Sequence, residues 1–537
     1  MNTFDSSAQT LSLVIFSAVV SVSLLMCMMT SAESDDLGDF YTGYRSLSPV
    51  RNGLAIAGDY ISGATILNTI GIVALTGYDG LTLALSTALS LLLLMFLLAE
   101  PLRNAGKFTM GDALARRFPS RQVRIVTSVI TLLALVPMIV VQLAGAGHLV
   151  ALILGFSGEG VRTGCIIVLG LLMIAYATIG GMKGTALIQI IKIVFLAGAV
   201  TIVAVLVMDR VGWSPVELLD RAKRGSGAGV AFLSSGLQFG TDITGRLDTI
   251  SGMLTVVIGA AVLPHVTMRM YTAKSAPDIR RAMSWASAVV IYVVLLIAVI
   301  GIGATALIGS RNIAAGSPQG SLAILQIGQA VVEDSGTFST LVFSAVATAV
   351  FLTLLSSVAG MTLACASSLA HDLFAQGLRD GTVSRGREMV TARLAGLGVG
   401  LPAVALAIVV QDWALQALIT LSFCIGASVI SPALVYSLFW RRYTRTGLLT
   451  TLIGGSACVL VLLTFSTVTS GGPNALIPGQ DFSWFPLHTT GLVSIPAGFL
   501  LGWLGTQLSD RRTRQRERQQ FDAVEPRILA GADAPPV

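Results

Sequence analysis

Charged residues are scarce in this sequence. Asp, Glu, Lys and Arg make up 12% of its 537 residues, whereas hydrophobic residues make up 54%, and the mean hydropathy is +0.81. Soluble domains usually carry roughly 25% charged residues, and a soluble chain of this length has too little interior to hide so much apolar surface. The composition therefore excludes a soluble protein and indicates an integral membrane protein with many helical spans.

Cysteine is also rare, and the motifs of several enzyme and pump classes are missing. No P-loop, glycine-rich dinucleotide turn or HExxH helix interrupts the chain, and no loop is long enough for a nucleotide-binding module. We therefore do not expect an ATP-driven pump, and no nucleophile, base or metal cluster indicates a membrane enzyme. Neither a disulfide framework nor a zinc site is expected, because the five cysteines fall inside apolar stretches without metal-site spacing: Cys27, Cys165, Cys365, Cys424 and Cys458.

Apolar runs of about 20 residues, the length that crosses a bilayer as a helix, divide the chain into about thirteen transmembrane helices. The first run follows Asp5 without any Lys or Arg, so we interpret it as a retained helix; Ser31 and Ala32 leave cleavage of a signal open. The expected fold class is an all-α membrane protein. Its helices are expected near 11–30, 53–77, 81–99, 125–154, 163–180, 186–208, 250–268, 284–308, 338–368, 391–411, 414–438, 446–467 and 488–507.

The net charge of +6 is explained by cytoplasmic loops rather than by a nucleic-acid partner. With thirteen spans, the odd-to-even loops and the C-terminal tail share one side of the membrane, and the positive-inside rule puts the N-terminus outside and the C-terminus in the cytoplasm of a plasma-membrane protein. The loop 209–249 is expected along the outer surface, and the tail 510–537 is expected to be disordered. That shared side holds most of the 34 Lys and Arg residues, including the Arg116–Arg117 pair, the Arg441–Arg442 pair and the Arg511–Arg518 cluster.

Span two carries an ionisable residue among small ones. It runs from Gly53 through Gly58, Asp59 and Gly63 to Thr65 before a clean apolar stretch. Small residues alone would be explained by close helix packing, but a packing face does not need a carboxylate, whose burial in a membrane costs at least about 2.5 kcal/mol. We therefore favour a binding site in this span, at which the helix is interrupted.

Span nine places Thr353, Ser356 and Ser357 at positions i, i+3 and i+4, so they share one helical face. Hydroxyl and carbonyl oxygens without thiols or imidazoles suit a hard monovalent cation rather than a transition metal. The alternative is that these hydroxyls only bond to their own helix backbone, as Ser and Thr in membrane helices commonly do. The pattern by itself leaves both interpretations open.

Span seven contains Gly259 and Pro264, which predict a kink or an unwound point. It lies five helices after span two, and two interrupted helices in corresponding halves point to a midplane binding site in inverted-repeat transporters. His265 beside the proline could relay protons, but a structural or interfacial role is the more common one for such a residue. Pro137 and Gln142 in span four either bend that helix or line the cavity.

Several segments together resemble the sodium/solute symporter family, most closely its bacterial cation/acetate branch, from about residue 35 to 465. The likeness rests on their order and spacing rather than on any one of them. The segments are Asp39–Ser46, Ala57–Ser62, Gly77–Gly80, Tyr176–Met182, Gln189–Lys192, Leu263–His265, Arg269 and Leu369–Leu373.

This resemblance implies a leucine-transporter-like fold with two inverted repeats of five helices. It also implies a sodium site between spans two and nine, with ligands that by position are Gly58 and Ile61 (Ala57 being the alternative to Gly58) and Thr353, Ser356 and Ser357. The implied domains are a first span with its cytoplasmic loop (1–52), the first repeat (53–208), an extracytoplasmic loop (209–249), the second repeat (250–438), two further spans (439–509) and the tail (510–537).

The resemblance also bears on the substrate. Sugar-carrying relatives place bulky polar side chains in span seven, where this chain has Val256–Ala260 with nothing larger than Ile258. This departure suits a small organic anion such as acetate, propionate or pyruvate, bound at the positive end of a half-helix. The expected substrate-binding residues are Ser62, Gly63, Ala64, Thr65 and Gly259.

The expected function is therefore import of a short monocarboxylate, coupled to sodium by alternating access. Besides substrate and sodium we expect the lipid bilayer as the surroundings, no further cofactor, and no nucleic-acid or obligate protein partner. The nearest alternative is proton coupling with Asp59 as the carrier of the proton. A channel or a transporter-like sensor is the more distant alternative.

Overall fold

The computed structural model describes residues 6–29, 37–153, 159–317, 319–332, 337–472 and 475–531. These residues form helices and their connections, with two isolated β-bridges in the loop before the last membrane helix. The helices are α1 (Ser6–Met29), α2 (Leu37–Thr42), α3 (Pro49–Tyr60), α4 (Gly63–Thr76), α5 (Tyr78–Leu93), α6 (Ala99–Ala105), α7 (Met110–Arg117), α8 (Arg121–Ile153), α9 (Glu159–Arg210), α10 (Pro215–Gly225), α11 (Ile243–Gly259), α12 (Pro264–Thr267), α13 (Ala276–Leu307), α14 (Ser310–Gly316), α15 (Ala323–Ala330), α16 (Thr337–Ser367), α17 (Arg385–Val409), α18 (Gln416–Ile425), α19 (Ser431–Phe439), α20 (Arg445–Thr464), α21 (Gly491–Leu508) and α22 (Arg511–Ala530).

Short 3-10 and π-helical segments join some of these helices. The 3-10 segments are η1 (Gly43–Arg45), η3 (Gly229–Leu233) and η4 (Met268–Thr272), and the π-helical segments are η2 (Leu94–Leu98), η5 (Ser368–Leu378) and η6 (Gly426–Ile430).

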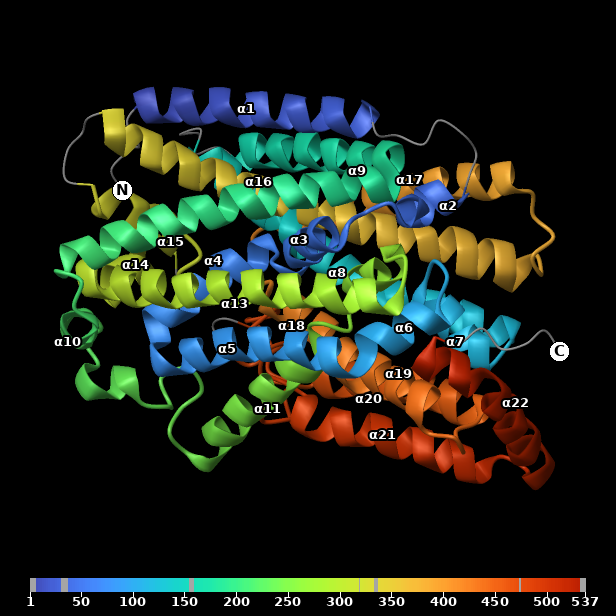
Figure 1. Ribbon diagram of the computed structural model, residues 1–537. Helices are drawn as coiled ribbons and strands as arrows, with labels where there is room; N and C mark the ends of the chain where they lie inside the picture. The colour runs from blue at the N-terminus through green and yellow to red at the C-terminus, as the bar shows by residue number, and fades with distance from the viewer. Residues whose placement is uncertain are drawn as a thin grey trace.

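Ten helices of the described chain are long and apolar enough to cross a membrane, or eleven when one bent pair counts as a single span. One of the ten is α9, which a non-helical backbone at Gly181 (φ 49°, ψ −151°) divides into two helices. The expected all-α membrane architecture is thus confirmed, while the expected count of thirteen stays a prediction. Figure 1 shows the long helices side by side, with α10 and α14 at one end of the bundle and α7 and α22 at the other.

Two helices are interrupted where the sequence predicted it. The axis bends by 58° between α3 and α4, because Ile61 leaves the helix in an extended conformation and Ser62 starts a new one, with a capping box between Ser62 and Thr65. The second interruption separates α11 from α12, which restarts at Pro264; proline fits this first position because it needs no N–H partner there. At each break a backbone N–H donates to a side-chain hydroxyl instead of a helical carbonyl: Ser62 N–H to Thr65 at 3.3 Å and Ala261 N–H to Ser90 at 3.0 Å.

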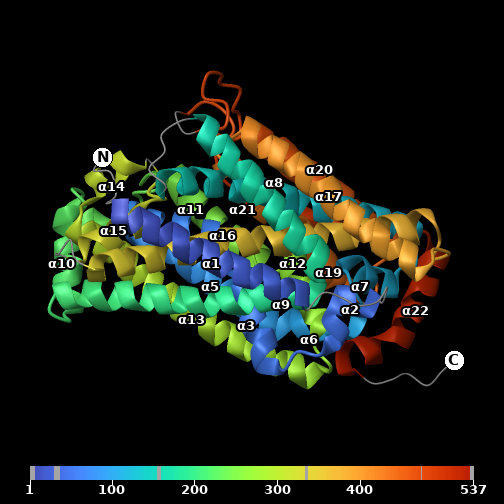
Figure 2. The same ribbon diagram turned by 90° about the horizontal axis from the view of Figure 1, so that it is seen from above.

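Helix α16 lies at the centre of the bundle. Figure 2 shows it passing among α1, α8 and α9, and it packs against all three. Buried residues make up 89% of its most apolar stretch, a higher share than in any other candidate span of the described chain. A helix surrounded by protein can afford hydroxyl residues on every side, since none of them has to face lipid.

A network of charged side chains lies at the end of the bundle that carries α7. Arg124 donates to Asp112 at 2.6 Å and to Asp372 at 2.8 Å, and His371 lies 2.7 Å from Glu388 and 3.1 Å from Asp112. Burial by itself would raise the pKa of Asp112, but His371 and Arg124 outweigh it and hold that pKa well below its ordinary value. Asp112, His371 and Asp372 are close enough to share a metal ion, yet the Arg124 guanidinium already lies between both carboxylates, so we assign the cluster a structural role.

The C-terminal tail differs from the disorder expected for 510–537. Within the described residues it forms α22, whose Phe521 and Ile528 are 0% and 1% exposed. The Arg117 guanidinium lies 4.0 Å from the Phe521 ring and Asp522 pairs with Arg441 at 2.5 Å. The two buried apolar residues, the cation–π contact and the ion pair explain why a segment of low hydrophobicity is folded here. The rest of the protein provides the apolar surface against which α22 packs, which the tail alone does not have.

Candidate functional site

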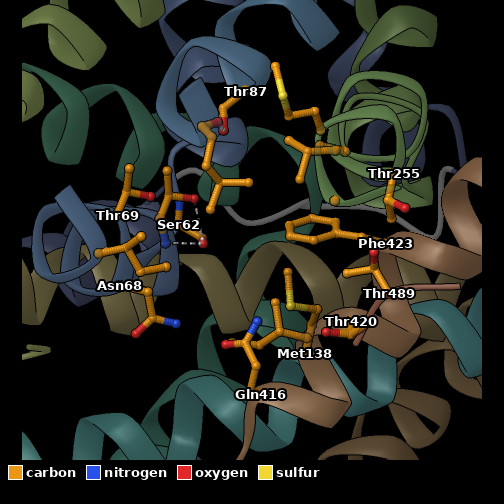
Figure 3. Close-up of a pocket in the computed structure, with 18 of the residues that line it drawn as sticks. Ser62, Asn68, Thr69, Thr87, Met138, Thr255, Gln416, Thr420, Phe423 and Thr489 are labelled. Carbon is orange, nitrogen blue, oxygen red and sulfur yellow. Dashed lines mark hydrogen bonds between the residues drawn. The ribbon is translucent and has the colours of Figure 1, made fainter. Parts of the chain in front are cut away.

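A cavity of about 130 Å³ lies at the broken helix α3/α4. Figure 3 shows Ser62, the N-cap of α4, and Thr69 of α4 on one side of it, opposite Thr255 of α11 and Phe423 and Thr420 of α18. An apolar cavity of roughly 150 Å³ is known to hold benzene. The space between these helices therefore suits a molecule of a few heavy atoms.

The lining of the cavity combines hydroxyl groups with apolar side chains. The hydroxyl side chains come from six helices or loops, and the apolar ones include Met138, Leu83 and Met361. Among the described lining residues, Asp79 is the only one with a fixed charge, and Lys and Arg are absent. A bound anion would therefore depend on backbone N–H groups and hydroxyl donors rather than on a cationic side chain.

The structure places the expected substrate-binding residues differently with respect to this cavity. Ser62 and Thr65 line it, and Ala64 belongs to the first turn of α4. A Cβ atom at Gly63 would lie 2.4 Å from Leu354 Cδ2, and one at Gly259 would lie 2.3 Å from the Phe423 carbonyl oxygen. Both glycines therefore sit at close helix contacts and, unlike the two hydroxyl residues, are not part of the cavity wall.

The three hydroxyl residues of α16 are fully buried and point back to their own helix. Thr353 donates to the Ala349 carbonyl at 2.6 Å, Ser356 to Leu352 at 2.6 Å and Ser357 to Thr353 at 2.7 Å. Each hydroxyl thus uses its hydrogen in the backbone bond and keeps its oxygen lone pairs for other partners, one of which is Lys192 Nζ at 3.3 Å from the Ser357 oxygen. The bonding pattern that was the alternative to a cation site is present, and it is compatible with cation binding.

Gln189 connects the two parts of the expected sodium site. Its side-chain amide donates to the Ser356 carbonyl at 2.9 Å and to the Asp59 carboxylate at 2.6 Å. A Cβ atom at Gly58 would lie 2.5 Å from the Gln189 carbonyl oxygen, so α3 touches α9 directly at this glycine. Ile61, at the break that follows α3, is fully buried. Residues of α3 and α16 thereby meet the same residue of α9.

A buried group of charges lies next to this junction. Asp59 was expected to have a proton or charge role, whereas the buried cations near it, Arg269 and Lys192, were not among the expected site residues. Asp59, 2% exposed, pairs with Arg269 of η4 as well as with Gln189. Lys192, one turn after Gln189, is fully buried and donates from Nζ to the Ser357 hydroxyl at 3.3 Å. A lysine inside an apolar span is itself a sequence signal for function; its partner is visible only in the structure.

Comparisons with known proteins agree with this architecture. Residues 40–455 match the sequence model of the Sodium:solute symporter family. The chain belongs to this family. The symporter is 35% identical over 510 residues to a protein of Corynebacterium glutamicum described as "Monocarboxylic acid transporter", with 92% of this chain and 91% of that protein covered. It is 34% identical over 500 residues to "Uncharacterized symporter YwcA" of Bacillus subtilis, with 93% and 94% covered.

Solved structures support the same fold. A Na+-coupled sialic acid symporter, in a substrate-bound outward-open state, superposes with a TM-score of 0.71 at 14% identity and covers 93% of this chain and 98% of its own. The nucleobase-cation-symport-1 family transporter MHP1 superposes with a TM-score of 0.51 at 15% identity, with 90% and 98% covered. The leucine-transporter-like fold expected from the sequence is therefore confirmed. The protein is a secondary symporter that crosses the membrane several times.

Proposed function

We propose that this symporter imports a short monocarboxylate, such as acetate, propionate or pyruvate, by alternating access. The observation that carries the proposal is the small cavity at the N-terminal end of α4, lined by hydroxyl and apolar groups. Ser62 and Thr65 offer hydroxyls at the positive end of the helix, where a carboxylate is stabilised. The apolar side chains of Met138 and Met361 suit a methyl or ethyl group. The likeness to a relative described as a monocarboxylic acid transporter supports the same substrate class.

We further propose sodium as the coupling ion, bound between α3 and α16. The ligands would be the backbone oxygens of Gly58 and Ile61, the Thr353 carbonyl and the hydroxyls of Ser356 and Ser357. Support comes from the lone pairs of the buried hydroxyls and from Gln189, which holds both helices. Hard oxygen ligands of this kind suit a monovalent cation without any thiol or imidazole.

One observation favours proton coupling as a second candidate. The Nζ atom of Lys192 lies 3.3 Å from the Ser357 hydroxyl oxygen, where sodium would otherwise find a ligand. Two positive charges at such a separation repel each other strongly in a buried site, so a protonated Lys192 would exclude sodium. Asp59, the carrier first considered for the proton, is already paired with Arg269. In the proton-coupled case Lys192 is therefore the better candidate than Asp59.

Uptake of labelled acetate into proteoliposomes separates the two candidates. Sodium coupling requires that an inward sodium gradient drives uptake at fixed pH, and that Ser356→Ala with Ser357→Ala abolishes the sodium dependence. The matched control is Ser367→Ala, because this buried serine of α16 makes the same kind of backbone bond, to Leu363 at 2.7 Å. Uptake driven by a pH gradient without sodium, and lost in Lys192→Met, would establish proton coupling instead. If the unaltered protein takes up no monocarboxylate under either gradient, the proposed function is wrong.

We propose the orientation that the cation distribution predicts, with the N-terminus outside and the C-terminus in the cytoplasm. The Arg-rich helices α7 and α22 lie at the same end of the bundle (Figure 1), which supports a cytoplasmic side there. The repeats would be 53–208 and 250–438, with 1–52, 209–249, 439–509 and 510–537 as the remaining parts. A membrane-impermeant thiol reagent should label an introduced Arg518→Cys only from the cytoplasmic side; labelling from outside would reverse the orientation.

A further inference from the structure

The loop between η3 and α11 reaches into the cavity that the proposed function assigns to the substrate. Gln238 and Phe239 line the cavity at the α3/α4 break, and both also line the hollow that leads from it toward Gln319 beside α14. The loop therefore stands between the cavity and one end of the bundle. Neither residue belongs to a membrane-spanning helix, so the span pattern gives no reason to expect them there.

The loop is held in place by Asp79 at the start of α5. Its carboxylate accepts the backbone N–H groups of Gly236, at 3.0 and 3.3 Å, and of Gln238, at 2.9 Å. Asp79 is 2% exposed, and charge-assisted bonds from backbone N–H groups are among the strong ones in proteins. The carboxylate also lies in the first turn of α5, where the helix dipole stabilises a negative charge. Asp79 thus fixes the backbone on both sides of residue 237.

The tip of this loop, residues 236–240, has a defined backbone conformation. Gly236 (φ 122°) and Gly240 (φ 97°) adopt backbone conformations that other residues rarely tolerate, and the Gly240 N–H donates to the Gly236 carbonyl at 3.1 Å. On its far side the tip lies directly on α11, because a Cβ atom at Gly245 would be 2.4 Å from the Phe239 carbonyl oxygen. The Phe239 ring packs against the His488 ring, with the centroids 5.3 Å apart. The tip therefore presents Phe239 in one fixed position.

We propose that the tip is the specificity-determining wall of the substrate cavity, with Phe239 limiting the length of the acid and Asp79 positioning the tip. This inference rests on the proposed function, since it concerns which monocarboxylates fit. The cavity is small, and most of its other lining residues belong to helices packed into the bundle. The tip, by contrast, is one loop held by two backbone N–H groups, which donate to Asp79, and by one ring contact. Its aromatic side chain is the bulkiest part of this wall. Shortening that side chain should lengthen the space open to the acid.

The test is competition against labelled acetate uptake by straight-chain acids from propionate to hexanoate. In Phe239→Ala, each methylene that newly fits should lower the half-inhibiting concentration by about fourfold relative to acetate, while Phe239→Trp should shift the preference toward acetate. Asp79→Asn should broaden the chain-length profile in the same direction as Phe239→Ala, a change in selectivity that a loss of folded protein would not produce. Leu233→Ala, an exposed residue of η3 outside the cavity, is the matched control and should leave the profile unchanged.

Each outcome decides the matter. An unchanged chain-length profile in both Phe239 variants, with acetate still transported, would overturn the inference and leave the proposed function standing. Absence of acetate uptake by the unaltered protein would overturn the proposed function itself. Should Phe239→Ala fail to fold, Phe239→Trp alone remains decisive, because a residue outside the substrate space would not narrow the profile.

Discussion

The pair formed by Asp59 and Arg269 is expected to carry a large share of the stability around the α3/α4 break. Both side chains are at most 2% exposed, and the carboxylate also accepts from Gln189 at 2.6 Å. Asp59→Asn removes the negative charge and leaves the Arg269 guanidinium buried with only weak partners, the closest hydroxyl being Thr185 Oγ1 at 3.3 Å. Removing one partner of a buried ion pair typically costs about 3–5 kcal/mol, because the other charge is left uncompensated.

The same reasoning predicts that the second substitution repairs part of the damage. Arg269→Gln alone should cost a similar amount, whereas the double variant should cost less than the sum by about 1–3 kcal/mol, since it buries no unpaired charge. Thermal or denaturant unfolding of the purified protein in detergent measures all four forms. The exposed pair of Arg280 and Glu100 is the control: Arg280 is 63% exposed, so its replacement by Gln should cost at most about 1 kcal/mol.

The outcome that would refute this account is additivity. If the two single costs at Asp59 and Arg269 add within about 0.5 kcal/mol in the double variant, the residues do not interact energetically. In that case the ion pair would not be what holds η4 against α3, and the stabilising contacts of this junction would have to be sought among Gln189 and its helix neighbours.

Three further predictions concern other parts of the fold. Gly58→Ala should destabilise the protein by about 1–3 kcal/mol and weaken sodium-driven uptake, because its Cβ atom would lie 2.5 Å from the Gln189 carbonyl oxygen. Gly198→Ala is the control and should be neutral or stabilising, since its Cβ atom would have nothing within 4 Å. Equal melting temperatures of the two variants would contradict this prediction. Asp112→Asn should lower the free energy of unfolding by about 3 kcal/mol at neutral pH. Because the pKa of Asp112 is lowered in the folded state, this difference in unfolding free energy between variant and unaltered protein should shrink as the pH falls through and below about 4. A pH-independent difference would contradict a stabilising role of the charged network. Phe521→Ala should release α22 and expose the tail to limited proteolysis, since a fully buried aromatic ring anchors it; unchanged protection would show that other contacts suffice.

Local patterns predicted the interruptions and the shared helical faces correctly. Hydroxyl residues at positions i, i+3 and i+4 must share a face of any helix, so Thr353, Ser356 and Ser357 were certain to lie together once α16 formed. The break at Ile61 was likewise local, because Ser62 and Thr65 provide the cap that starts α4. Such features depend on neighbours within one helical turn.

Long-range partners could not be inferred in the same way. Asp59 meets Gln189 across 130 positions and Arg269 across 210, and nothing in the local sequence specifies these distances. The packing of the C-terminal tail could not be inferred from its own sequence either: its composition predicts disorder, yet Phe521 is buried against the bundle. A charge or a ring near the end of a span has many possible partners, and only the folded helices select among them.

The amino-acid sequence by itself determined that the chain belongs in a membrane, because apolar length and the scarcity of charge act on every helix separately. It also determined where the spans break, since a cap or a proline needs only adjacent residues. The tertiary structure alone decided that Lys192 faces Ser357, that Asp59 is paired with Arg269, and that a loop outside the spans reaches the cavity at Phe239. These contacts join segments that the chain keeps far apart, and their energies exist only once the helices have packed.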